Sequence, residues 1–159
     1  MSEGYDNGIR LERKFAKEIK CILGLVFIGQ DAEMDRNQAT DFLTFTIKNI
    51  KVACRLRTYN YYLKYPDEFT IRSELYSGNK TELQKIREEL VDYIFYGFVD
   101  ENENKIIRYF IGDLDIFRKY EQTIKYEKQI NKDARPNKFR AYKINHFPRI
   151  FIIKEYTKE

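Results

Sequence analysis

A strict alternation of apolar and polar residues between residues 43 and 57 constrains the fold more than any other feature of the chain. The apolar positions are Leu43, Phe45, Ile47, Ile50, Val52, Cys54 and Leu56. Successive side chains of a strand point to opposite faces, so these residues share one face. Lys48 and Asn49 interrupt the pattern and indicate a tight turn. The segment therefore predicts a β-hairpin, with Lys51, Arg55 and Arg57 on the face opposite the core.

Further elements are expected before and after the hairpin. Apolar residues at helical spacing predict a helix over residues 9–23, followed by a short strand over 25–29. Thr81 and Gln84 form a capping-box pattern, which begins a helix that turns Leu83, Ile86 and Leu90 inward. The other expected elements are strands over 68–74, 91–99, 105–111, 139–144 and 149–156 and a charged helix over 114–130. This order is typical of an α/β fold with a central mixed sheet flanked by helices.

Length and composition favour one domain over residues 1–159. The 12 Phe and 13 Tyr indicate a core filled largely by aromatic rings. The formal charge of +4 is mild and compatible with attraction to phosphate. The chain has only two cysteines and no charged-then-apolar leader, which favours a reducing cytoplasm. No membrane span is expected, because the longest nearly apolar run, Cys21 to Gly29, is far shorter than the roughly 20 residues needed.

Three carboxylates and one lysine are candidates for metal binding and catalysis. Asp41 opens the first hairpin strand, and Glu12 lies on the polar side of the first helix. Glu82 and Lys85 lie three residues apart in the first turn of a later helix. Carboxylate oxygens suit Mg²⁺, and a lysine beside them stabilises a phosphoryl transition state or orients water. Two alternatives stay open, because Asp41 also suits a turn cap and the Glu82 and Lys85 pair also suits an ordinary surface ion pair.

A second set of candidates is basic and aromatic, as nucleic-acid binding requires. Its members are Lys51, Arg55, Arg57, Arg72, Tyr59 and Tyr61. Cations on one strand face can contact successive phosphates, and the arginine fork binds two phosphate oxygens at once. Tyrosine rings provide surfaces on which bases stack. The alternatives are a solvated sheet face, or pairing of Arg55 and Arg57 with strand neighbours such as Glu68 or Glu74.

Five short segments together carry a resemblance to a known class of proteins. They are Asp41-Phe42, Ala53-Cys54-Arg55-Leu56-Arg57, Phe69-Thr70-Ile71-Arg72-Ser73, Thr81-Glu82-Leu83-Gln84-Lys85-Ile86 and Asp92-Tyr93-Ile94-Phe95-Tyr96-Gly97. These segments, and the helix, hairpin, strand, helix, strand order of residues 9–99, resemble small phage and mobile-element proteins of the restriction-endonuclease-like, PD-(D/E)XK class. The resemblance implies a nuclease-like core over about two thirds of the chain.

The resemblance also implies roles for individual residues. In that class an Asp and an acidic-X-Lys triplet on the next strand bind Mg²⁺ and position the attacking water, which makes Asp41 a metal ligand. The place of the triplet here reads Arg55-Leu56-Arg57. Some members of the class move the acid or the lysine to a neighbouring element, which points to Glu82 and Lys85, or to Glu74. Without such a move, two arginines at this place repel a metal ion and attract phosphate.

Three functions are therefore open. The first is a nuclease-fold protein that acts on DNA, with Mg²⁺-dependent hydrolysis at Asp41, Glu82, Lys85 and Glu12. The second is a non-catalytic nucleic-acid-binding protein of the same fold. The third is a phage protein-interaction or inhibitor module, in which the tyrosine-rich segment over residues 59–65 contacts a protein partner. A homodimer is compatible with each of them.

Overall fold

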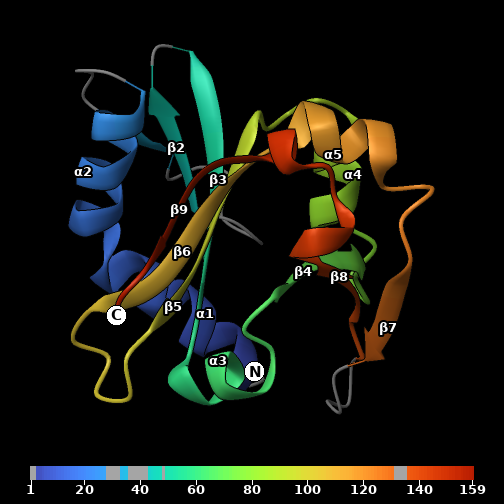
Figure 1. Cartoon of the computed structure of the whole chain (residues 1–159). Coiled ribbons are helices and arrows are strands. Elements are labelled where there is room, and N and C mark those ends of the chain that lie inside the picture. The colour runs from blue at the N-terminus through green and yellow to red at the C-terminus, as the bar shows by residue number, and fades with distance from the viewer. Residues whose placement is uncertain (1–2, 28–32, 36–42, 48, 131–135) are drawn as a thin grey trace.

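The computed structural model describes residues 3–27, 33–35, 43–47, 49–130 and 136–159 (Figure 1). Its larger sheet has six strands in the order β1-β2-β3-β5-β6-β9. These strands are β1 (Glu33–Asp35), β2 (Leu43–Ile47), β3 (Ile50–Arg57), β5 (Tyr93–Val99), β6 (Ile106–Asp113) and β9 (Ile152–Thr157). The sheet is mixed, because β3 and β5 are parallel and all the remaining neighbouring strands are antiparallel. The predicted hairpin is confirmed as the β2–β3 pair.

A second sheet holds three antiparallel strands in the order β4-β8-β7. Its strands are β4 (Glu68–Glu74), β7 (Tyr126–Ile130) and β8 (Lys138–Lys143). The expectation of one central sheet is thus corrected, because β4 pairs with β8 and leaves the larger sheet. The helix predicted over 114–130 is wrong beyond Tyr120, where α5 (Leu114–Tyr120) ends. The β7 residues pair with β8 instead, and Tyr126 packs on the Tyr142 ring at a centroid distance of 5.7 Å.

Two successive helices replace the single predicted helix near the start of the chain. They are α1 (Glu3–Lys14) and α2 (Ala16–Val26), separated at Phe15. The strand predicted over 25–29 is wrong for its described part, because α2 continues through Gly24 to Val26. Leu23 and Val26 pack on the larger sheet at helical spacing, which favours continued helix over a strand. Residues 28 and 29 lie outside the described part of the chain.

Two short helices follow the hairpin. The tyrosine-rich connection forms α3 (Tyr59–Lys64), which the sequence did not predict as a helix. The capping box at the start of α4 (Glu82–Arg87) is confirmed, since the Gln84 N–H donates to Thr81 Oγ1 at 3.1 Å and the Thr81 N–H donates to Gln84 Oε1 at 2.8 Å. The inward orientation predicted for Leu90 is wrong, because α4 ends before it and Leu90 is exposed.

Hydrophobic residues cover both faces of the larger sheet. On one face α1 and α2 pack Leu11, Ile19 and Leu23 against β3, β5 and β6. The other face packs on the second sheet and α5 through an aromatic core centred on Phe69. Rings within 6.2 Å of Phe69 belong to Tyr96, Phe110, Phe117, Tyr142, Phe147 and Phe151. The expectation of an aromatic core is confirmed, and the two sheets share it. No helix in the described ranges is long and apolar enough to cross a membrane.

The aromatic core predicts a large effect for one added methyl group. A Cβ at Gly112 would lie 2.7 Å from the Phe151 ring, so this ring, which is buried against Phe69 and Phe147, would have to shift. We expect Gly112→Ala to lower the free energy of unfolding by about 1–3 kcal/mol, as overpacked cores do. Urea unfolding measures this, with Lys119→Ala on the exposed side of α5 as control. Equal stability of the two variants would contradict the packing described.

Candidate functional site

A cluster of buried charged residues lies where α1, β3, β4 and α4 meet. The buried cluster, as we call it, consists of Glu12, Arg55, Arg72 and Glu82, each exposed by 6% or less. Arg55 extends from β3 toward two carboxylates, with its Nε 4.0 Å from Glu12 Oε1 and its Nη2 in an ion pair with Glu82 Oε1. The face of β3 predicted to be opposite the core is thus itself buried, and the solvated-face alternative is wrong for Arg55. Glu74, offered as its partner, pairs with Lys138 at 2.7 Å.

Both carboxylates of the buried cluster also bind a strand edge. Glu82 Oε2 accepts the Arg72 N–H of β4 at 2.8 Å, and Glu12 Oε1 accepts the Leu56 N–H of β3 at 3.1 Å. The pairing of β2 with β3 is described as far as Cys54, and Leu56 lies beyond it. A buried backbone N–H needs a partner, and each glutamate supplies one where no described strand does. Glu12 and Glu82 therefore have structural roles that the sequence did not indicate.

Burial shifts the pKa values of two members of the buried cluster, Glu12 and Arg55. Burial raises the pKa of Glu12 to about 7, and the Arg55 charge and the Leu56 N–H oppose this rise only in part. Burial and the nearby Arg57 charge lower the pKa of Arg55 to about 10. Glu12 is thus a carboxyl group that titrates near neutral pH.

Arg57 lies beside the buried cluster and has a different set of partners. Its Nε donates to Tyr96 Oη at 3.0 Å, its Nη2 donates to Thr70 Oγ1, and its guanidinium lies 4.9 Å from the centre of the Tyr61 ring. None of the ion pairs between described residues includes Arg57. Burial opposes its charge, but the Tyr96 and Tyr61 oxygens outweigh this effect and the pKa of Arg57 is raised. The guanidinium is held by hydroxyl groups and a ring, and its charge interacts with the nearby Glu12 carboxylate without an ion pair between them.

Two residues of this arrangement were missed by the sequence reading. Thr70 and Tyr96 hold Arg57, and their oxygens lie 3.3 Å apart. Both stand in the segments that carry the family resemblance, but neither had a role there. The one available signal was the alternation in β4, which places Thr70 on the same side as Arg72.

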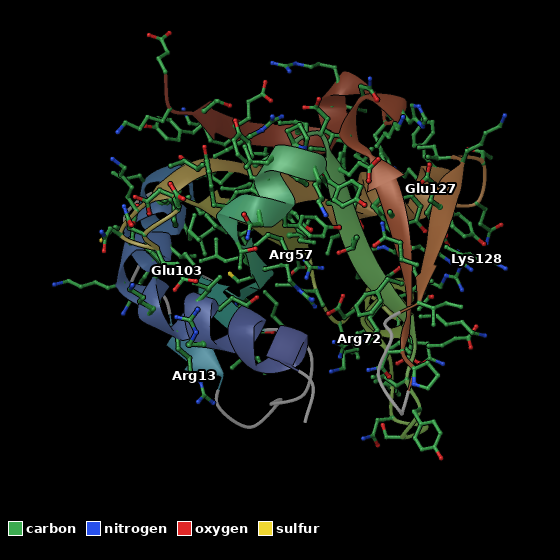
Figure 2. The ribbon with its side chains drawn as sticks, turned by 90° about the horizontal axis from the view of Figure 1, so that it is seen from below. Arg13, Arg57, Arg72, Glu103, Glu127 and Lys128 are labelled. Atoms are coloured by element: carbon green, nitrogen blue, oxygen red, sulfur yellow. The ribbon has the colours of Figure 1, made fainter. Side chains whose placement is uncertain are left out.

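Arg72 lies on the second sheet, on the side that Thr70 turns toward Arg57 (Figure 2). Its guanidinium stacks 5.2 Å from the centre of the Phe139 ring, its register partner on β8. The arginines predicted for nucleic-acid binding therefore gather around one junction between the two sheets. Tyr61 joins them through its ring, which lies against Arg57, and its predicted role in stacking bases stays a prediction.

The other predicted site residues lie away from the junction or outside the described residues. Lys51 is at the other end of β3 from Arg57, six residues or about 20 Å away along the strand. Tyr59 leaves α3 on a side other than that of Tyr61 and lines a separate pocket. Lys85 is half-buried on α4, and no side-chain hydrogen bond or ion pair within the described part of the chain includes it. Asp41 lies outside the described residues.

A magnesium ion does not fit the described carboxylates alone. Among the residues described, no group of three or more acidic, His or Cys side chains is arranged to hold a metal. Both oxygens of Glu82 are engaged, and the Arg55 guanidinium contacts both carboxylates as a shared cation would. Metal binding through Asp41 stays a prediction. Comparison of the chain with family models, curated proteins and solved structures found no significant match.

The raised pKa of Glu12 predicts how stability depends on pH. Between its ordinary pKa of 4.5 and about 7, the folded protein keeps a proton that the unfolded chain releases, so this proton's contribution to stability falls as the pH rises. Glu12→Gln removes the titration and keeps an acceptor for the Leu56 N–H. We expect the stability of Glu12→Gln relative to the unchanged protein to rise by up to about 1.4 kcal/mol per pH unit in this window.

Urea unfolding from pH 4 to 8 measures this difference. Glu88→Gln, an exposed carboxylate paired with Lys80, is the control and should change stability by less than about 1 kcal/mol throughout. A Glu12→Gln difference that does not vary with pH would show that the Glu12 carboxyl group titrates normally.

Proposed function

We propose that this protein binds nucleic acid, with DNA as its target, and that Arg57 contacts a backbone phosphate. The observation that carries the proposal is the environment of Arg57. Hydroxyl groups of Thr70 and Tyr96 hold its guanidinium, and no described carboxylate forms an ion pair with it, while the nearby Glu12 carboxylate contributes to its raised pKa. Its neighbour Arg55 contacts two glutamates, so the two arginines that share one strand face differ in what they can bind.

A half-buried guanidinium that no described carboxylate pairs with directly attracts an anion. Burial weakens solvation of the charge, so an oxyanion that approaches it gains more than it would at an exposed lysine. The arginine fork matches two phosphate oxygens, and its raised pKa keeps it charged at any physiological pH. Because Tyr96 and Thr70 already fix its orientation, little side-chain freedom is lost when a phosphate binds.

Aromatic rings around Arg57 favour a nucleic acid over a simple anion. The Tyr61 ring lies against its guanidinium, and the Tyr65 ring lies 5.0 Å from that of Tyr61. A phosphate contact beside aromatic rings is typical of sites for unpaired nucleotides, in which bases stack on the rings. We therefore propose single-stranded or branched DNA as the target. Duplex DNA serves as the reference in binding measurements.

The frame we propose is a divergent restriction-endonuclease-like one. Support comes from the order of α1, the β2–β3 hairpin, β4, α4 and β5, and from the parallel pairing of β3 with β5. Arg55 and Arg57 stand where that class keeps its acid and lysine, which favours a phosphate-binding site over a metal-dependent one. A phage or mobile-element origin and a cytoplasmic location belong to the same proposal.

The binding proposal predicts a loss of affinity in Arg57→Gln. We expect it to weaken binding of single-stranded or branched DNA by about tenfold and to reduce the slope of log affinity against log salt by about one. Arg57→Lys keeps the charge but not the fork, and should fall between Arg57→Gln and the unchanged protein. Fluorescence anisotropy at several salt concentrations measures both quantities.

A matched control keeps this experiment specific. Arg149→Gln removes an exposed arginine that pairs with Glu155, and should leave affinity within about twofold of the unchanged protein. Folding of each variant is checked by urea unfolding. The proposal fails if the folded protein retards no single-stranded, duplex or branched DNA at low salt, or if Arg57→Gln binds as well as Arg149→Gln. A stable complex with a protein in place of DNA would favour an interaction module.

Phosphodiester hydrolysis at the same cluster is a second candidate function. It is favoured by the pKa of about 7 at Glu12, because a carboxyl group that titrates near neutral pH can act as a general acid or base. It predicts DNA cleavage that requires added Mg²⁺ or Mn²⁺, stops with a chelator, and is lost in Asp41→Ala and in Glu82→Gln. Gel electrophoresis of labelled DNA detects it. Intact DNA after incubation with folded protein would exclude hydrolysis and leave the binding proposal unchanged.

A further inference from the structure

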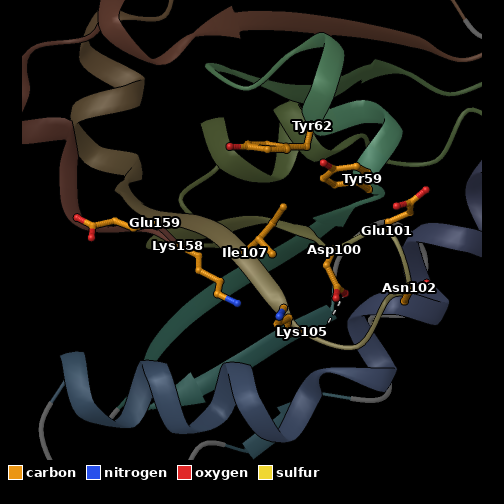
Figure 3. A pocket seen from close by; sticks show the side chains of 9 residues that line it. All are labelled: Tyr59, Tyr62, Asp100, Glu101, Asn102, Lys105, Ile107, Lys158 and Glu159. Carbon is orange, nitrogen blue, oxygen red and sulfur yellow. Dashed lines mark hydrogen bonds between the residues drawn. The ribbon is translucent and has the colours of Figure 1, made fainter.

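A separate pocket lies on another side of α3 from Arg57. It has a volume of about 390 Å³, in the range of roughly 300–1,000 Å³ that is usual for small-ligand sites. Its walls come from α3, from the turn between β5 and β6, and from the residues that follow β9 (Figure 3). None of the residues assigned to DNA binding lies in it except Tyr59.

Two tyrosine rings form one wall of this pocket. Tyr59 and Tyr62 are one helical turn apart on α3, and their ring centroids lie 6.1 Å apart. Tyr62 is supported from behind by Phe98, 5.3 Å away, and Ile107 of β6 forms the adjoining floor. Such a wall offers a flat ring a surface for stacking.

Two lysines lie across the pocket from these rings. The Lys158 N–H donates to the Ile107 carbonyl at 2.8 Å, which holds the end of the chain against β6 and beside Lys105. The Lys105 ammonium, as a hydrogen-bonding neighbour and a like charge, lowers the pKa of Lys158. Two cations held this close repel each other. Asp100 offsets this repulsion only in part, because the pKa of Lys158 stays lowered, and a further anion placed between the lysines would relieve it.

Acidic residues also line the pocket. Asp100 Oδ1 accepts the Asn104 N–H at 2.6 Å and the Lys105 N–H at 3.0 Å, and its carboxylate also interacts with the charges of Lys105 and Lys158. Glu159 is a further acidic residue of the lining. Glu101 is exposed at the rim on the tyrosine side, where Figure 3 shows it near Tyr59. A carboxylate beside a stacked base is an acceptor for ring or exocyclic N–H groups. The pocket thus combines a stacking wall, an acceptor and a pair of cations.

We infer that this pocket binds a phosphorylated nucleoside, with the base on Tyr59 and Tyr62 and the phosphate between Lys105 and Lys158. The ligand is either a free nucleotide or the terminal nucleotide of a single strand, since both present the same base and phosphate. The site does not depend on Arg57, which lies on the side of α3 that carries Tyr61.

Isothermal titration calorimetry of the full chain with the four deoxynucleoside monophosphates tests this assignment. We expect at least one of them to bind, and the matching nucleoside without phosphate to bind at least about fivefold more weakly. Tyr59→Leu and Lys158→Gln should each weaken binding by about fivefold or more, as loss of one base stack does. Tyr76→Leu and Lys119→Gln, which alter the same residue types at exposed positions outside the pocket, should stay within about twofold.

Further arms distinguish the source of the ligand and the two proposals. Binding of a short single strand that requires its terminal phosphate identifies a strand end, and equal binding of the monophosphate alone identifies a free nucleotide. This inference is tested by Tyr59→Leu and Lys158→Gln with a monophosphate, and DNA binding is tested by Arg57→Gln with a strand, so a failure of DNA binding at Arg57 and a failure here are separate results. The inference is overturned if no monophosphate binds at 10 mM, roughly the weak end of ligand affinity. It is also overturned if Tyr59→Leu and Lys158→Gln bind the monophosphate as well as their controls do. Binding of a cation, with arginine methyl ester as the probe, in place of the nucleotide would overturn it as well.

Discussion

The ion pair between Arg55 and Glu82 is the interaction on which the junction of the two sheets depends. Arg55 belongs to the larger sheet, Glu82 begins α4, and the other oxygen of Glu82 holds the backbone of β4. Glu12 adds α1 to the same guanidinium. Loss of one member would leave a charge buried without its partner, which costs about 3–5 kcal/mol in comparable pairs. Four elements are therefore held in register by one cation and two carboxylates.

The two neighbouring arginines of β3, Arg55 and Arg57, differ in how their charges are held. Arg55 is neutralised inside the protein and contributes to its architecture. Arg57, two residues along the same strand, is oriented by Tyr96 and Thr70, which bring no negative charge. In the function we propose, this oriented guanidinium without a direct ion pair is the one that contacts an external phosphate. The contrast between the two arginines, and not the number of basic residues, is the reason to assign phosphate binding to this junction.

The helix α3 connects the junction with the second pocket. Tyr61 faces Arg57, whereas Tyr59 and Tyr62 face Lys105 and Lys158. The three tyrosines of this six-residue helix thus present aromatic rings to two cationic regions that are otherwise separate. By our proposals, a nucleic acid bound at Arg57 and a nucleotide held in the pocket would contact different sides of α3. Both assignments rest on the same chemistry, in which rings bind bases and cations bind phosphate.

Local sequence patterns determined a good part of this protein. The alternation over residues 43–57 predicted the β2–β3 hairpin and which β3 side chains share a face, and Thr81 and Gln84 predicted the start of α4. Such features depend on residues that are neighbours in the chain, so the sequence suffices for them. The charged segment after Tyr120 misled the same reasoning, because β8 recruits it as a strand.

Only the tertiary structure decided the surroundings of the β3 face that carries Arg55 and Arg57. The sequence placed Arg55 and Arg57 together, but whether that face meets water or protein depends on how the second sheet packs over it. The carboxylates of Glu12 and Glu82 reach Arg55 from α1 and α4, and the hydroxyl groups of Thr70 and Tyr96 reach Arg57 from β4 and β5. No local pattern encodes these meetings, because each requires elements distant in the chain to pack before the charges come within reach.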